Sequence, residues 1–177
     1  MEDPMNHRKI LALVAIMLLP FASYAHNTAT VKVMDAKGAE VGILTLTQQD
    51  KGVLLQFDGH GLPPGEHGIH LHEKGSCIAP DFKSAGGHLN PGGKGHGFDE
   101  KGGHHAGDLH NLNVNADGTA HYKELNADVT LEHKKPNSLW TESGTSLVIH
   151  AKTDDYMSQP AGNAGDRIAC GVIQSKD

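Results

Sequence analysis

Residues 30–57 read TVKVMDAKGAEVGILTLTQQDKGVLLQF, and this stretch decides the fold class. Short segments in which apolar and polar residues alternate are separated by turn signals at residues 36–38 and 49–52. In the middle segment Leu44 and Leu46 share one face, as in a strand with one buried side. Strands at roughly ten-residue spacing predict an antiparallel sandwich or barrel.

The same pattern continues to the end of the chain, and no stretch shows a convincing helical repeat. Further strands are expected over residues 68–72, 112–115, 119–125, 129–131, 146–152 and 168–173. The sequence therefore predicts one all-β domain of about eight antiparallel strands.

A glycine-rich segment interrupts this pattern between Gly75 and Gly107. It holds ten glycines and no hydrophobic periodicity. Loops of this length in compact domains are usually functional or disordered. Metal coordination would offset the entropy lost when such a loop becomes ordered.

Histidines open and line this loop. His70 and His72 are two residues apart, so in a strand both side chains point to the same face and can chelate one metal ion. The loop then adds further candidate ligands: His88, His96, His104, His105 and Asp108. Imidazole suits copper and zinc, and a carboxylate is an ordinary fourth ligand of zinc, so two metal ions are expected.

The amino terminus indicates export. Residues 1–25 are predicted to be a signal peptide, because a basic segment precedes a short apolar run and a small-x-small cleavage site ending at Ala25. The acidic start Met1-Glu2-Asp3-Pro4 is atypical, so either Met5 is the true start or the first four residues are an added remnant. The mature domain would span residues 26–177.

Charge and cysteine content narrow the function classes. The formal net charge is −6 and no basic run is present, which argues against nucleic acid as a partner. The two cysteines, Cys77 and Cys170, most simply form one disulfide in an exported protein; the alternative is two free buried thiols. After removal of the signal peptide, no membrane association is expected.

Several segments together resemble the copper–zinc superoxide dismutases, and the resemblance covers essentially the whole mature chain. The matching segments are GIHLHE at 68–73, GGHLNP at 86–91, HAGDL at 105–109, VIH at 148–150 and GNAGDRIACGVI at 162–173. Residues 156–160 lack the lysine and glutamate of the eukaryotic branch, so the chain is similar to the exported, periplasmic bacterial branch.

The resemblance implies a role for each matching residue. Copper would be bound by four histidines: His70, His72, His88 and His150. Zinc would be bound by His88, His96, His105 and Asp108, which makes His88 a bridging imidazolate. Asp154 would hydrogen-bond to His70 and His96 as an outer carboxylate. Arg167 would hold the anionic substrate beside copper, and Cys77 and Cys170 would form the family disulfide.

The implied fold is a Greek-key, eight-stranded antiparallel β-barrel with a long metal-binding loop. The implied activity is dismutation of superoxide to molecular oxygen and hydrogen peroxide, with one redox-cycling copper and one structural zinc per chain. His88 and Arg167 would be the catalytic residues. The resemblance leaves open whether the chain is a monomer or a homodimer.

Two other functions are weighed against this one. A non-enzymatic copper or zinc buffering or delivery protein could use the same barrel, but it needs neither His150 nor Arg167. A zinc hydrolase would need an open zinc position and a general base, and no His-Glu-x-x-His motif is present.

Some residues near the site have no assigned ligand role. Of the neighbours His104 and His105, only one should coordinate, because adjacent side chains diverge in extended backbone, and His105 is favoured. Five other histidines have no matching role: His60, His67, His110, His121 and His133. The loop lysines are either substrate-steering groups or solvated surface residues: Lys74, Lys83, Lys94 and Lys101.

Overall fold

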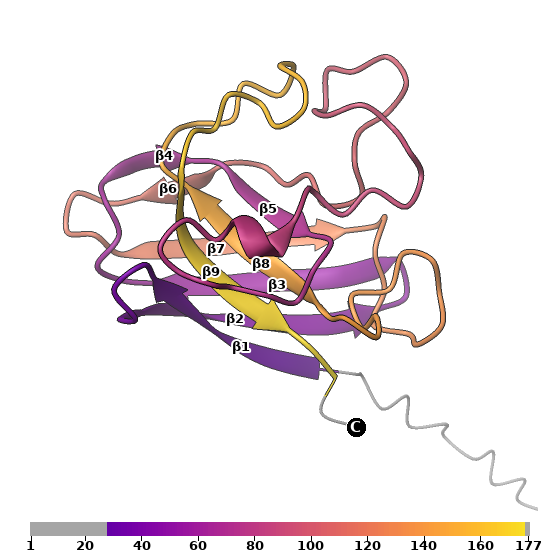
Figure 1. Ribbon diagram of the computed structural model, residues 1–177, viewed down its shortest axis with the longest axis horizontal. Coiled ribbons are helices and arrows are strands. Elements are labelled where there is room, and N and C mark those ends of the chain that lie inside the picture. Colours follow the sequence, from indigo (N-terminus) through magenta and orange to yellow (C-terminus); the bar gives the residue numbers. More distant parts are fainter. Residues whose placement is uncertain (1–27, 176–177) are drawn as a thin grey trace, which may run out of the picture.

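The computed structural model describes residues 28–175, and the predicted signal peptide lies outside this range. Within it the chain forms strands and one turn of 3-10 helix (Figure 1). The elements in order are β1 (Thr28–Asp35), β2 (Glu40–Gln49), β3 (Gly52–Gly59), β4 (Gly65–His67), β5 (Ile69–His72), η1 (Lys83–Ala85), β6 (Leu112–Val114), β7 (Ala120–Asn126), β8 (Thr145–His150) and β9 (Arg167–Ile173). Residues 28–175 contain no helix of the length and apolarity needed to cross a membrane.

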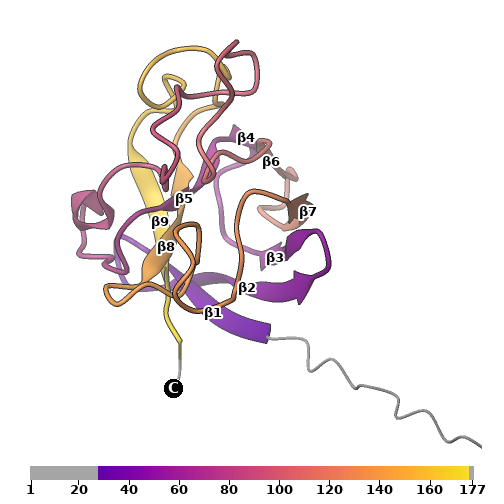
Figure 2. The same cartoon turned by 90° about the vertical axis from the view of Figure 1, so that its right-hand side faces the viewer.

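One curled antiparallel sheet holds most of the strands, in the order β5-β8-β9-β1-β2-β3-β7. A small second sheet pairs β4 with β6. Figure 2 shows this pair between β5 and β7, where it completes the ring of strands. Strands distant in sequence, such as β1 and β9 or β3 and β7, are neighbours, which is the crossing connectivity of a Greek key. The predicted all-β barrel is confirmed.

Buried and more exposed residues alternate along the amino-terminal strands, and the buried ones form the core. Leu44 and Leu46 of β2 and Leu55 and Phe57 of β3 are fully buried, whereas the residues between them are more exposed. Strand β8 differs because all its residues are buried. Its outer face is covered by the long loop, where Phe82 packs in a small cluster with buried neighbours Ala85, Val148 and Cys170.

The structure corrects two details of the predicted strands. The strand expected at 129–131 is wrong: Thr130 makes only an isolated bridge to Ser138, although Val129 and Leu131 are buried. The side-chain oxygen of Gln48 accepts the Leu131 backbone N–H, so this loop is buried without a strand partner. The added short strand β4 raises the number of strands to nine in residues 28–175.

The long loop between β5 and β6 contains only η1, as its composition predicted. Figure 1 shows its middle part beside the loop that joins β8 to β9. Hydrogen bonds join these two loops, including one from the Asp99 backbone N–H to the Tyr156 carbonyl. One loop follows β5 and the other follows β8, and these two strands are paired.

Candidate metal centre

The loop returns twice to the free edge of β5. The Leu71 backbone N–H donates to the Gly107 carbonyl, and the Leu71 carbonyl accepts from the Leu89 N–H, both over 2.8 Å. Gly107 must be glycine here, because a Cβ at this position would lie 2.2 Å from the Leu71 oxygen. Isolated bridges consequently place His70 opposite Asp108 and His72 opposite His88.

One buried group consists of histidines from β5, the loop and β8: His70, His72, His88 and His150. Their candidate ligand nitrogens all lie within 4.8 Å of one another. Four of these buried ring nitrogens have no hydrogen-bond partner: Nδ1 of His70 and Nε2 of His72, His88 and His150. Buried polar atoms are normally paired, so four converging unpaired nitrogens fit a bound cation, and imidazole ligands suit copper.

The opposite ring nitrogens of three of these histidines are held by fixed partners. His70 Nε2 lies 2.7 Å from an Asp154 carboxylate oxygen, and His72 Nδ1 lies 3.0 Å from the Gly86 carbonyl. His150 Nδ1 lies 3.3 Å from the Gly165 carbonyl. Each of these acceptors favours the tautomer in which the inward nitrogen has a free lone pair for a metal ion.

A second buried group lies next to the first and consists of His88, His96, His105 and Asp108. Nδ1 of these three histidines lies 2.8, 3.0 and 3.2 Å from Asp108 Oδ1, in that order. A tetrahedral zinc ion with ligands at about 2.0 Å separates those ligands by roughly 3.3 Å. The donor set and its spacing therefore fit zinc. His88 belongs to both groups, with Nδ1 facing the second group and Nε2 facing the first.

Burial keeps the first group neutral and ready to bind a metal. Burial lowers the pKa of His70 to about 3 and that of His150 to about 4, and it lowers the pKa values of His72 and His88. At neutral pH these rings therefore carry no proton on the nitrogens that face one another.

The carboxylates remain charged. Burial alone would raise the pKa of Asp108, but hydrogen bonds from His105, His88 and His96 outweigh it and hold this pKa well below its usual range. Asp154 behaves in the same way, because its oxygens accept hydrogen bonds from His70 and His96. Asp154 thus joins one histidine of each group.

Arg167 points its guanidinium toward the carbonyls of the long loop. Nη1 donates to the Phe82 oxygen over 2.8 Å, and Nη2 donates to the Gly86 oxygen over 2.7 Å. Burial lowers the pKa of Arg167, but a guanidinium stays charged at any pH at which the protein is folded.

A cavity of about 460 Å³ lies beside this guanidinium. It is lined by Pro80, Asp81, Lys83, Gly165, Asp166 and Arg167. Lys83 is the loop lysine that reaches this cavity, and its ammonium lies 3.1 Å from an oxygen of Asp81.

Sequence reasoning left out three residues that support the centre. His67 is buried, and its ring nitrogens lie 2.7 Å from the His150 carbonyl and 2.8 Å from the Pro63 carbonyl.

The Gln159 amide accepts the His96 backbone N–H and donates to the His96 carbonyl. Asn111 makes the same kind of paired contact with the backbone of Asp154. Of these three residues, only His67 had a sequence signal, because it lies just before the strand that carries His70 and His72. Gln159 and Asn111 lie in loops whose sequences show no repeating pattern.

The remaining histidines that were left unassigned stay outside both groups. These are His60, His110, His121 and His133, together with His104. His104 Nδ1 lies 2.8 Å from the carbonyl of its neighbour His105, so its ring turns away from the second group.

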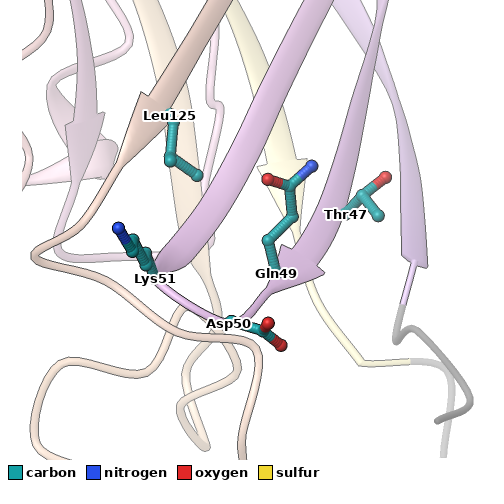
Figure 3. A pocket seen from close by; sticks show the side chains of 5 residues that line it. All are labelled: Thr47, Gln49, Asp50, Lys51 and Leu125. Atoms are coloured by element: carbon teal, nitrogen blue, oxygen red, sulfur yellow. The ribbon is translucent and has the colours of Figure 1, made fainter.

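Another pocket lies at the turn between β2 and β3 (Figure 3). Its lining residues are Thr47, Gln49, Asp50, Lys51 and Leu125. It contains none of the residues of the two groups, and no histidine or cysteine lines it.

The cysteines are paired in the structure. Cys77 of the loop and Cys170 of β9 form a disulfide across a sequence separation of 93 residues. Together with the Phe82 cluster, this bond fastens the first part of the loop to the sheet next to Arg167.

Comparison with known proteins identifies the family. A family model described as copper/zinc superoxide dismutase (SODC) matches residues 40–173. Copper–zinc superoxide dismutase 2 of Aquifex aeolicus (strain VF5) is 45% identical over 164 residues, which cover 92% of this chain and 96% of that protein.

Solved structures agree. A SOD-like protein from Bacillus subtilis superposes with a TM-score of 0.80 at 40% identity, covering 84% of this chain and 99% of that one. Cu/Zn superoxide dismutase from Brucella abortus superposes with a TM-score of 0.68 at 31% identity, covering 84% of this chain and 100% of that one. The chain belongs to the copper/zinc superoxide dismutase family.

Proposed function

We propose that this protein dismutates superoxide to molecular oxygen and hydrogen peroxide at a copper ion, with a zinc ion beside it. The copper ligands would be the first group, namely His70, His72, His88 and His150. The zinc ligands would be the second group, namely His88, His96, His105 and Asp108. The observation that carries the proposal is the convergence of four unpartnered buried nitrogens next to a fixed guanidinium.

Copper supplies an electron acceptor and donor in turn, whereas zinc has no accessible redox change and would only hold ligands. The residues of the chain would bind the substrate anion and hold a proton. Arg167, aimed by two carbonyls, binds the anion. His88 Nε2, which has no protein partner, would bind copper, and it is the atom that could hold a proton for the peroxide product whenever copper does not occupy it. A buried ring with a metal on each side would be an imidazolate.

Local charge supports an anionic substrate on an acidic protein. The chain has a net charge of −6, which would repel superoxide at long range. Two divalent ions and Arg167 would make the site itself positive. Asp81 and Asp166 also line the cavity, so attraction must come from the metals, Arg167 and Lys83.

A metal-buffering protein is the alternative from another class. It would bind the same ions but would gain nothing from Arg167 fixed beside the first group. Superoxide consumption by the purified protein, loaded with copper and zinc, separates the two functions. Fast turnover supports dismutation; full loading with both ions and no turnover would favour buffering.

The bridging role of His88 needs its own experiment. His88→Ala should weaken both metals, because this residue offers one nitrogen to each group, whereas His105→Ala should weaken zinc alone. Metal content after dialysis and the copper(II) spectrum of each variant report this difference. If His88→Ala kept wild-type zinc and an unchanged copper spectrum, the bridge would be wrong.

Export is part of the proposal. Residues 1–25 would be removed as a signal peptide, leaving a periplasmic domain of residues 26–177. The Cys77–Cys170 disulfide supports an oxidising compartment. Sequencing the amino terminus of the exported protein should return His26; an uncleaved chain in the cytoplasm would contradict this. A homodimer is a further hypothesis, and sedimentation of the mature protein tests it.

A further inference from the structure

The peptide group between Gly86 and Gly87 is held from both of its sides. Its carbonyl oxygen accepts Nη2 of Arg167 over 2.7 Å and Nδ1 of His72 over 3.0 Å. Its N–H, on Gly87, donates to Oε1 of Glu73 over 3.2 Å. One peptide group thus links a carboxylate to a copper ligand and to the anion-binding arginine.

Glu73 is placed for this contact by its position in the chain. It directly follows His72, and its backbone N–H donates to the Gly87 carbonyl over 3.0 Å. Its side chain then folds across Gly86: a Cβ there would lie 2.5 Å from Glu73 Oε1 and 2.8 Å from its Cγ. Gly86 also has a φ of +76°, so only glycine suits this position.

We propose that Glu73 is a positioning residue for superoxide dismutation, which orients and polarises the Gly86–Gly87 peptide so that one carbonyl fixes His72 and Arg167 together. The inference rests on the proposed function. A hydrogen bond to an ionised carboxylate is stronger than one between neutral groups, and hydrogen bonds in a chain strengthen one another. Partners one step behind metal ligands commonly change metal affinity or activity when they are removed.

The charge of Glu73 would act on turnover in the direction opposite to positioning. A negative charge near Arg167 repels an incoming anion, and removing it would speed the reaction. Glu73 is exposed, however, so water and salt screen its charge, whereas the hydrogen bond acts through a single peptide group. We therefore expect positioning to outweigh repulsion.

Two substitutions separate the two effects. Glu73→Ala removes both the acceptor and the charge, whereas Glu73→Gln removes the charge and keeps an acceptor oxygen at the same reach. Glu142→Ala, at another exposed acidic residue, is the matched control for losing one surface charge. All four proteins are compared at equal copper and zinc content, with circular dichroism as a check of folding.

The readouts are the dissociation constant of azide, a small anion that binds copper(II), the copper(II) spectrum, and the rate of superoxide consumption. Glu73→Ala should weaken azide binding and slow turnover by roughly tenfold and shift the copper spectrum, as for loss of an outer hydrogen-bond partner. Glu73→Gln should recover part of each loss, because a neutral amide oxygen accepts a weaker hydrogen bond than a carboxylate, and Glu142→Ala should match the wild type.

Three results would overturn the proposal. Tighter azide binding and faster turnover in both Glu73 variants would show that repulsion dominates. A Gln variant as impaired as the Ala variant, or an Ala variant identical to the wild type, would also contradict it. If the wild type itself consumed no superoxide, the proposed function would fail, while azide binding and the copper spectrum would still test how Glu73 positions Arg167 and His72.

Discussion

His72 and Arg167 donate to the same acceptor, the carbonyl oxygen of Gly86. One of them is a predicted copper ligand and the other the predicted anion-binding group. Their positions are therefore not independent: a shift of this carbonyl would move the metal ligand and the guanidinium together. The loop that carries Gly86 therefore fixes the positions of both side chains, His72 and Arg167.

Substitution of Arg167 tests the anion-binding role. Arg167→Ala should leave both metals bound and reduce the rate of superoxide consumption at least roughly tenfold, because local charge changes association rates from about 10-fold to 1000-fold. Arg167→Lys should restore only part of the rate, since its charge remains but the planar fork that donates to Phe82 and Gly86 does not.

Salt provides the control for this prediction. Screening acts over about 10 Å at 0.1 M ionic strength, so added salt should slow the wild type more than Arg167→Ala. Equal rates and equal salt dependence in the three proteins, at matched copper content, would show that Arg167 takes no part.

Reduction of the Cys77–Cys170 disulfide should affect stability and the site. The bond closes a loop with a sequence separation of 93 residues, which corresponds to about 4 to 5 kcal/mol in the chain-entropy model. It also lies in the Phe82 cluster, and the Phe82 carbonyl holds Arg167. We expect a lower melting temperature and slower turnover after reduction, measured with metals bound. Equal midpoints and equal rates would contradict both parts.

Gln159 should control zinc retention. Its amide accepts the His96 N–H over 2.8 Å and donates to the His96 carbonyl over 3.0 Å, so it holds the backbone of a predicted zinc ligand. Gln159→Ala should release zinc to a chelator about tenfold faster with little effect on copper. Gln159→Glu, which keeps the acceptor and loses the donor, should lie between. Parallel loss of both metals would point to general unfolding instead.

The metal-free protein should be most stable near pH 6.5. The folded-state pKa values of His70 and His150 are lowered to about 3 and about 4 by burial, against about 6.5 in the unfolded chain. Below about pH 6.5 the unfolded chain therefore binds more protons, and stability falls toward acid. Each residue should remove on the order of 2 kcal/mol by about pH 4.5.

His96 has the opposite sign. Burial lowers its pKa, but hydrogen bonds to Asp108 and Asp154 outweigh burial and raise it to about 9. Its stabilisation is complete below about pH 6.5 and is lost as the pH rises through about 9. Urea unfolding of chelator-treated protein at about pH 4.5, 6.5 and 9 measures both the loss of stability toward acid and the loss toward alkaline pH. Equal free energies of unfolding at about pH 4.5 and 6.5 would contradict the assigned burial effects.

The sequence predicts the strands where one face is buried and the other is not. The alternation of Leu44 and Leu46 was sufficient for β2, because period two has one structural meaning there. It failed at Val129 and Leu131, which have the same spacing and burial, because the Leu131 backbone N–H donates to the side-chain oxygen of Gln48 and not to a neighbouring strand. Periodicity reports burial and does not report the backbone partner.

The metal groups show a similar limit. His70 and His72 could be paired from spacing alone, but their convergence with His150 depends on the pairing of β5 with β8, and the resemblance to a family supplied that link. The contacts of Gln159 with His96, and of Glu73 with Gly87, join loops that have no repeating pattern. Such contacts are set by the fold as a whole and leave no local signal.

The most direct test of copper-dependent dismutation is a titration of copper into zinc-loaded, copper-free protein while superoxide consumption is measured. The group formed by His70, His72, His88 and His150 would bind one copper ion. We therefore expect the activity to rise linearly with added copper and to level off at one copper per chain. Fast consumption of superoxide before copper is added, or copper bound at this ratio without activity, would contradict the account.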